Sequence, residues 1–223
     1  MKYSILIDGY FLEKNIEVAT NGNTKITIAH IQNVCRCIFN YNENNADEVD
    51  KIYYYDSLPI NVRYEVNPIN ETKYKISRSK YFNFKVNLFN DLENAPDERN
   101  SDCIFKLKLG YIEASTWEVK EDFVKAGHII RSSSVRPKFT QKCVDVELAL
   151  DLVLLAQKEE IKRLFIMTND SDFSPVIKYA LELGTRIILV TLNDILVSSR
   201  LKEIVDDIIC LDTKRDVILT CEF

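Results

Sequence analysis

The sequence predicts an α/β fold in which a mainly parallel sheet lies between layers of helices. Short runs rich in β-branched residues alternate with segments of helical periodicity, most clearly after residue 132. The chain has 223 residues, of which 46% are hydrophobic and 28% charged, enough to fill a sizeable core beneath a charged surface. No internal repeat is evident and five glycines leave little room for a linker, so a single domain over residues 1–223 is the economical interpretation.

Apolar runs and helical periodicity define the expected elements of the N-terminal half. In order these are a strand at residues 3–7, helices at 10–18 and about 27–41, and a tyrosine-rich strand at 51–55. The first strand ends at Asp8-Gly9.

The middle of the chain has a weaker pattern. Residues 58–70 contain two prolines and are expected to form a loop with a short turn of helix. Residues 72–90 fit a helix through Phe82, Val86 and Phe89, and they also fit a strand, so periodicity leaves both open. A polar loop at 94–102 and a strand at 103–112 follow.

The C-terminal part alternates regularly. The expected elements are a helix at 144–157, strands at 163–168, 186–191 and 207–211, and helices at 175–183 and near 195–204. Ser174 is expected to cap the helix that begins at Pro175, and Gly184 to end it.

Composition excludes several classes of protein. The net charge of −5 argues against an overall basic nucleic-acid binder, although local basic patches remain compatible with it. No apolar run approaches the roughly 20 residues that span a membrane, and the first run ends at Asp8, too early for a secretory signal. The six cysteines form no CxxC pair and are interpreted as reduced thiols of a cytoplasmic protein.

Acidic residues follow two of the predicted strands. Asp8 comes directly after the first strand, and Asp170 and Asp172 come after the strand at 163–168. Parallel strands bring their carboxyl ends to one edge of the sheet, so these side chains are expected to gather there. Asp145 opens the helix at 144–157, and Asp151 lies about 120° further around it, so the two need not face one point.

A cluster of carboxylates raises the pKa of its members unless a cation neutralises it. Oxygen ligands without histidine or thiolate suit Mg²⁺ or Mn²⁺, which can activate water for phosphodiester hydrolysis. Each acid also has an ordinary structural interpretation, because Asp8, Asp145, Asp170 and Asp172 all precede or open helices. Asp151 is different, since a carboxylate among leucines needs a partner.

Three segments resemble the NYN domain family of the PIN-like nuclease superfamily. They are ILIDGYF at 5–11, QKCVDVELALDL at 141–152 and FIMTNDSDFSPVIKYALELGTRIILV at 165–190. The last is the most specific, because the family commonly reads S-G-D-S-D-F before an apolar helix. The middle, about 57–100, matches only loosely.

The resemblance implies a Rossmann-like, three-layer PIN-like fold and a Mg²⁺- or Mn²⁺-dependent endoribonuclease. Carried over by position, Asp8, Asp145 and Asp170 are the expected metal ligands, Asp172 completes the cluster and Asp151 is a further member. Thr168 or Asn169 is expected to orient water or phosphate. The chain departs from the family where Cys143 replaces a usual glycine, Thr168-Asn169 replaces Ser-Gly, and Tyr10 replaces a frequent asparagine.

Two basic stretches are candidates for contact with RNA. Residues 72–90 carry five basic residues, including Arg78 and Lys80, no acidic one, and interleaved aromatic residues. A solvated helix face with core aromatic residues explains this stretch equally well. The second stretch leads directly to Asp145 and contains Arg131, Arg136, Lys138 and Lys142.

The leading functional hypothesis is a metal-dependent endoribonuclease acting on single-stranded or structured RNA, with DNA left open as a substrate. The alternative is a non-catalytic module that keeps the fold and binds RNA or protein. A phosphoacceptor receiver domain, with Asp56 as acceptor, is disfavoured because Gly9-Tyr10 stands where a second acid is wanted. Membrane association is not expected, and a homo-oligomer is compatible with the sequence.

Overall fold

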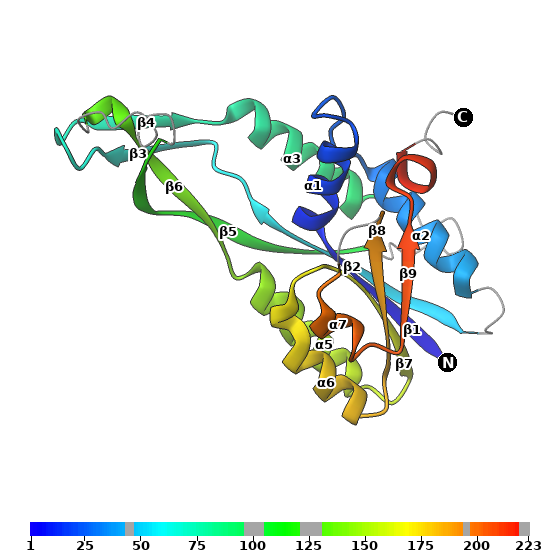
Figure 1. Ribbon diagram of the computed structural model, residues 1–223. Coiled ribbons are helices and arrows are strands. Elements are labelled where there is room, and N and C mark those ends of the chain that lie inside the picture. The colour runs from blue at the N-terminus through cyan, green and yellow to red at the C-terminus, as the bar shows by residue number, and fades with distance from the viewer. Residues whose placement is uncertain (43–46, 96–104, 121–130, 194–196, 219–223) are drawn as a thin grey trace. The chain divides into compact units, whose positions relative to one another are not determined.

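A computed structural model describes residues 1–42, 47–95, 105–120, 131–193 and 197–218 (Figure 1). Its strands are β1 (Lys2–Asp8), β2 (Glu48–Leu58), β3 (Val62–Val66), β4 (Lys73–Ser77), β5 (Phe105–Val119), β6 (Val135–Lys142), β7 (Ile161–Met167), β8 (Arg186–Leu192) and β9 (Asp207–Leu211). Its helices are α1 (Gly9–Ala19), α2 (Ile28–Asn42), α3 (Ser79–Glu93), α5 (Val144–Ala156), α6 (Ser174–Glu182) and α7 (Ser199–Lys202). Three short helical turns are η1 (Ser132–Ser134), η2 (Ser171–Phe173) and η3 (Thr213–Ile218).

The chain divides into two compact units. The first unit contains Met1–Asp56, Leu88–Lys108 and Asp145–Phe223, and the second contains Ser57–Asn87 and Leu109–Val144. β2, α3 and β5 each begin in one unit and end in the other. The second unit therefore comes from two separate stretches of chain, one of which includes much of the loosely matching middle segment around 57–100.

A seven-stranded sheet has the order β6-β5-β2-β1-β7-β8-β9. β1 pairs in parallel with β2 and β7, and the parallel pairing continues from β7 to β8 and from β8 to β9. β5 and β6 pair antiparallel within the second unit. The prediction of a mainly parallel sheet is therefore only partly right, because the sheet is mixed. The antiparallel strand β6 lies at the sheet edge, where such strands commonly join parallel sheets.

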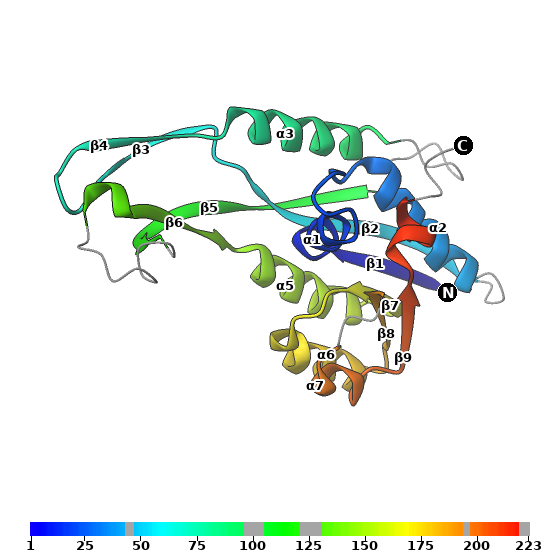
Figure 2. The same cartoon turned by 45° about the horizontal axis from the view of Figure 1, so that its top comes forward.

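Helices of the first unit cover both faces of its sheet. In Figure 2, α1 and α2 lie on one face, and α5, α6 and α7 lie on the other. The strands between them are almost entirely enclosed: Ile5, Leu6 and Ile7 of β1 and Phe165 and Ile166 of β7 are all fully buried. Burial on both faces explains why these strands read as continuous apolar runs in the sequence.

The middle of the chain differs most from expectation. Residues 58–70, expected to be a loop with a helical turn, contain strand β3, which pairs antiparallel with β4. The two prolines are typical of a loop, which is why a strand was not expected here. They flank the strand and do not interrupt its alternating pattern. Residues 72–90 hold both predicted structures in succession, since β4 ends at Ser77 and α3 begins at Ser79.

The C-terminal elements agree closely with the periodicity. α5, β7, α6, β8 and β9 lie within two residues of their expected bounds, whereas the helix expected near 195–204 is restricted to Ser199–Lys202, and 194–196 lie outside the described residues. Ser174 is the first residue of α6 and not its cap, and its hydroxyl donates to the carbonyl of Ser171 at 2.6 Å. Gly184 follows α6 with a φ of +83°, which suits a helix stop.

Two other expectations concern the ends of elements. The strand expected at 103–112 is β5, which extends to Val119, and residues 103 and 104 lie outside the described part, as do 96–102 of the expected loop.

None of the helices in the described part of the chain is long and apolar enough to cross a membrane.

Candidate active site

Asp8 stands at the junction of β1 and α1 and makes two hydrogen bonds. Its Oδ1 accepts from the backbone N–H of Phe11 at 3.0 Å, so the side chain caps α1. Its Oδ2 accepts from the hydroxyl of Thr168 at 3.4 Å. Thr168 is fully buried and comes directly after β7, so this contact joins the ends of two neighbouring strands.

Gly9 allows the chain to turn into α1 close to β2. A Cβ at this position would lie 2.6 Å from the Cζ and Oη atoms of Tyr54, a distance that side chains do not tolerate. The Tyr54 hydroxyl in turn donates to Oδ2 of Asp56 at 3.5 Å. The Asp-Gly sequence thus serves both capping and close packing at this edge.

Burial and neighbouring charge act on the Asp8 carboxyl. Burial raises the pKa of Asp8 to about 6, and the Asp145 and Asp56 carboxylates add to the rise. The hydrogen bonds from Phe11 and Thr168 oppose it, since both stabilise the charged form. Ionised Asp8 is therefore a costly group at neutral pH unless a cation is bound nearby.

Asp170 and Asp172 follow β7 on the turn η2. Asp170 caps this turn, because its Oδ1 accepts from the backbone N–H of Asp172 at 2.9 Å. The backbone N–H of Asp170 donates to the hydroxyl oxygen of Thr168 at 3.2 Å. One threonine hydroxyl therefore donates to Asp8 and accepts from Asp170, which fixes the ends of β1 and β7 to each other. Both Asp170 and Asp172 are exposed.

Asp145 couples these two groups of acids. It lies in the first turn of α5. Desolvation by neighbouring atoms raises the pKa of Asp145, and the charges of Asp170 and Asp172 raise it further. Asp145 also acts on Asp8. Asp145 is therefore electrostatically coupled to Asp8 on one side and to Asp170 and Asp172 on the other.

Residues 111–212 match the model of the NYN domain family. This match agrees with the resemblance to the NYN family that the sequence motifs indicate. The matched stretch contains Asp145, Asp151, Asp170 and Asp172, whereas Asp8 lies before it. A nuclease-like hydrolase is the class of protein that this family indicates.

A solved structure shares the fold. The crystal structure of a protein of unknown function from Vibrio parahaemolyticus aligns with a TM-score of 0.53 and 17% sequence identity, covering 98% of this chain and 96% of that chain. At this identity the likeness supports the α/β fold with its large mixed sheet. No curated protein matches the chain.

Cys143 occupies a special backbone position just before α5. Its φ is +69°, in the left-handed region that favours glycine. The glycine of the K-G-V-D pattern noted above suits such a position, and this chain adopts the same left-handed φ with a cysteine. Helix α5 begins at the next residue, Val144.

The described acidic residues are not arranged as a ready metal site. No three His, Cys, Asp or Glu side chains within them are grouped closely enough to hold a metal ion. The donor chemistry nevertheless suits a hard cation, because Asp8, Asp145, Asp170 and Asp172 offer only carboxylate oxygens and two of them have raised pKa values. Binding of an ion would require rotation of these side chains toward one another.

Asp151 has other partners. It is nearly buried, and its two oxygens lie 3.2 and 3.1 Å from the Lys108 ammonium. The hydroxyl of Tyr55 donates to Oδ2 at 3.0 Å. These contacts answer the need for a partner that its leucine-rich surroundings imposed, and they occupy the oxygens that a metal would use.

Replacing Asp151 with asparagine is expected to lower the free energy of unfolding by about 2 kcal/mol, because Lys108 and Tyr55 lose a charged acceptor. The folded fraction of this variant should give the same result as the wild type in an RNA-cleavage assay. Urea unfolding measures the first effect, and the triple variant Tyr55→Phe/Lys108→Met/Asp151→Leu should recover much of the stability, since it removes both charges and the hydroxyl that Asp151 accepts from. A stable Asp151→Asn protein without cleavage would instead make Asp151 a ligand.

Asp56 is the site residue that motif reasoning did not place here. It lies near the end of β2, is buried, and contributes to the raised pKa of Asp8. In the register of the parallel strands, Asp8 stands beside Tyr55. The rule that selected Asp8, an acid at the carboxyl end of a parallel strand, would also have selected Asp56.

The basic residues near the start of the NYN match alternate along β6. Arg136, Lys138 and Lys142 share one face of this strand. Arg136 pairs with Glu118 at 2.8 Å and Lys142 with Glu113 at 4.0 Å, so only part of this charge is available to a ligand. Arg131 and Lys138 are exposed.

The other proposed substrate contacts have mixed surroundings. Asn169 Oδ1 accepts from the backbone N–H of Ser198 at 3.4 Å, so this side chain holds a loop. The Arg78 guanidinium lies over the rings of Tyr81 and Phe139, at 6.0 and 5.1 Å from their centroids. Lys80 is exposed. Lys85, from the same basic stretch, is buried, so residues 72–90 do not present one continuous basic surface.

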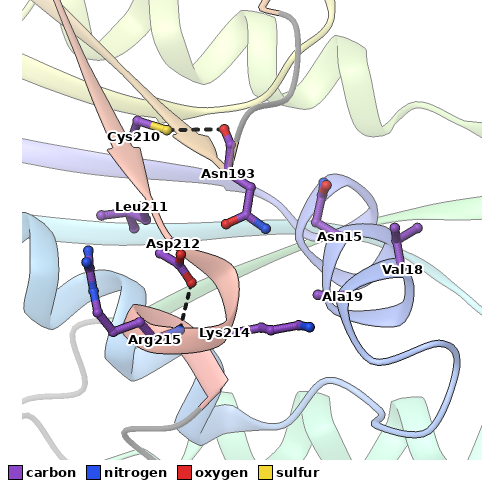
Figure 3. A pocket seen from close by; sticks show the side chains of 9 residues that line it. All are labelled: Asn15, Val18, Ala19, Asn193, Cys210, Leu211, Asp212, Lys214 and Arg215. Atoms are coloured by element: carbon purple, nitrogen blue, oxygen red, sulfur yellow. Dashed lines mark hydrogen bonds between the residues drawn. The ribbon is translucent and has the colours of Figure 1, made fainter.

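A pocket of about 580 Å³ lies between α1 and the segment that follows β9 (Figure 3). Its lining residues are Asn15, Val18, Ala19, Asn193, Cys210, Leu211, Asp212, Lys214 and Arg215. Several polar groups bond within the wall: Thr213 N–H donates to Asn193 Oδ1 at 2.7 Å, and Arg215 N–H donates to Asp212 Oδ1 at 2.8 Å. None of the expected site acids lines this pocket.

Proposed function

We propose that this NYN protein is a Mg²⁺- or Mn²⁺-dependent ribonuclease that hydrolyses phosphodiester bonds in RNA. The observation that carries the proposal is the Thr168 hydroxyl, which links Asp8 to the backbone of Asp170 at the carboxyl ends of β1 and β7. The charge of Asp145, at the start of α5, acts on Asp8, and the charges of Asp170 and Asp172 act on Asp145. Three of these acids lie inside the NYN match, which favours nuclease chemistry.

These four carboxylates are the proposed metal ligands. A divalent cation held by them would neutralise charge on the phosphate and would lower the pKa of the attacking water. Thr168 holds the Asp8 carboxyl through its hydroxyl, and the backbone contacts of Asp170 hold the second acid. Asp151 is left outside this set because Lys108 and Tyr55 already engage its oxygens.

The test is a cleavage assay with end-labelled single-stranded RNA, structured RNA and DNA, each in Mn²⁺, Mg²⁺ or chelator. The proposal expects the RNA to be cut with either metal and to stay intact in chelator. Cleavage that continues in chelator contradicts a metal-dependent mechanism. Additional cleavage of DNA would widen the substrate class and leave the chemistry unchanged.

A second candidate is a non-catalytic module that uses the same fold to bind RNA or protein. The spacing of the acids favours it, because no three donors among the described residues are grouped as a metal site requires. This candidate expects RNA binding that is equal in metal and chelator, with no product under any condition. The same assay, run with a binding measurement alongside, separates the two.

A further inference from the structure

Strand β3 of the β3–β4 hairpin places its apolar residues on the solvent side, whereas Ile76 of β4 is buried on the other face. Val62, Tyr64 and Val66 of β3 are 46%, 60% and 57% exposed. The residues between them, Arg63 and Glu65, form an ion pair on the other face. Strands covered on one side normally show the opposite alternation, with apolar residues inward. A contiguous exposed apolar row of this kind indicates a binding surface.

Two lysines lie on the same face of the hairpin. In the antiparallel register Tyr64 stands opposite Lys75, and Val66 stands opposite Lys73, so these side chains project together. Both lysines are exposed, and neither forms an ion pair with a described residue. No acidic residue belongs to this face, defined here as Val62, Tyr64, Val66, Lys73, Lys75 and Ser77 and called the hairpin face.

The turn of the hairpin is held by internal contacts. Asn67 is buried, its Oδ1 accepts from Ile69 N–H at 2.9 Å, and its Nδ2 donates to the carbonyl of Ser132 at 3.0 Å. Backbone bonds from Asn67 N–H to Thr72 and from Glu71 N–H to Asn67 close the turn at 2.9 Å each. The hairpin face is therefore presented with little conformational freedom left to lose on binding.

We infer that the hairpin face binds single-stranded nucleic acid, with a base stacked on Tyr64 and phosphates held by Lys73 and Lys75. An exposed aromatic ring beside unpaired cations is the usual arrangement for unpaired bases. The two lysines lie two positions apart on one strand, which corresponds to about 6.8 Å along the strand. This spacing suits successive phosphates of an extended chain. The identity of the polymer as RNA rests on the proposed ribonuclease function.

Charge favours this occupant over a second copy of the protein. Self-association through the hairpin face would bring the lysines of two copies together without an acid on that face to offset them. A polyanion offsets the same charges. The apolar flanks Val62 and Val66 then cover the faces and edges of the stacked base.

The test measures binding of fluorescent (U)₂₀ to the full chain in chelator, which prevents metal-dependent cleavage. Tyr64→Ala is expected to weaken binding about tenfold, whereas Tyr64→Phe, which keeps the ring, should bind like the wild type. The double variant Lys73→Ala/Lys75→Ala should reduce the slope of log affinity against log salt concentration by about 1.4. Binding of (dT)₂₀ with the same sensitivity also supports the inference, because stacking does not read the 2′-hydroxyl.

Matched controls are Tyr179→Ala and Lys158→Ala/Lys162→Ala, which alter exposed residues elsewhere. Wild-type affinity in Tyr64→Ala, or an equal loss in Tyr179→Ala, overturns the inference. So does a wild-type dimer that Tyr64→Ala dissociates without any change in RNA affinity. Tyr64-dependent RNA binding without cleavage in any metal refutes the ribonuclease and leaves the hairpin face standing. RNA cleavage by a Tyr64→Ala protein that binds RNA with wild-type affinity supports the ribonuclease and overturns the inference about the hairpin face.

Discussion

Replacing Asp170 with asparagine is expected to lower metal-dependent RNA cleavage by more than about 100-fold while the protein stays folded. A ligand should matter at least as much as an outer-shell partner, whose loss costs up to about 100-fold. Asparagine keeps an oxygen that accepts from the Asp172 N–H, so the turn η2 should survive. The substitution removes only the negative charge beside Asp145.

The control for this prediction is Asp91→Asn, which removes a carboxylate from the exposed surface of α3. It should cleave RNA like the wild type. Thermal unfolding followed by circular dichroism checks that both variants are folded. Wild-type cleavage by a folded Asp170→Asn protein would remove Asp170 from the site. The ribonuclease proposal would then lose the metal ligand that it places directly after β7.

The variant Asp8→Asn is expected to be more stable than the wild type in the absence of metal, by up to about 3 kcal/mol at pH 7.5. This difference in the free energy of unfolding follows from the rise of the Asp8 pKa from 3.8 to about 6. The amide oxygen of asparagine can still accept from Phe11 N–H, so the cap of α1 is kept. Its amide nitrogen replaces the oxygen that accepts from Thr168, so that hydrogen bond is kept only if the Thr168 hydroxyl oxygen accepts instead. The buried charge is lost.

The pH dependence of this stabilisation has a definite sign. The folded carboxyl holds its proton more tightly than the unfolded one, so Asp8 costs nothing below about pH 4, where both states are protonated. The cost grows as pH rises from about 4 to about 6 and is constant above that range. Urea unfolding in chelator at pH 4, 5, 6 and 7.5 should show the two proteins converging in acid.

Asp91→Asn again serves as the control, because its stability should follow the wild type at each pH. An Asp8→Asn protein that is less stable than the wild type at pH 7.5 would show that the Asp8 charge supports the fold. A difference that does not change with pH would show that the effect arises from packing and not from ionisation.

Much of the first unit could be predicted from sequence because its strands are covered on both faces. Ile5, Phe165 and Ile188 lie in continuous apolar runs. Helices α2 and α6 each have a regular apolar stripe, and α5 is apolar almost all round. The strand β3 was harder to predict, because Pro59 and Pro68 on either side of it are typical of a loop. Its alternating pattern is that of a strand, but the apolar residues Val62 and Tyr64 face solvent and do not mark a core.

The meeting of the ends of β1 and β7 was predictable for a geometric reason. Parallel pairing places Ile7 beside Met167, so the residues that follow them meet at one edge. The same reasoning should have included Asp56. The partner of Asp151 was not predictable, because Lys108 is 43 residues away and comes close only through the tertiary fold.

Direct Mn²⁺ binding tests the central claim, that the four acids form a metal site. Calorimetric titration at pH 7.5 compares the wild type with Asp145→Asn, because Asp145 interacts with Asp8 and with both acids after β7. The account predicts saturable binding to the wild type that Asp145→Asn weakens at least about tenfold, the lower end of the loss expected even for an outer-shell partner. Equal affinity in the two proteins, or no binding to the wild type with or without RNA, would contradict it.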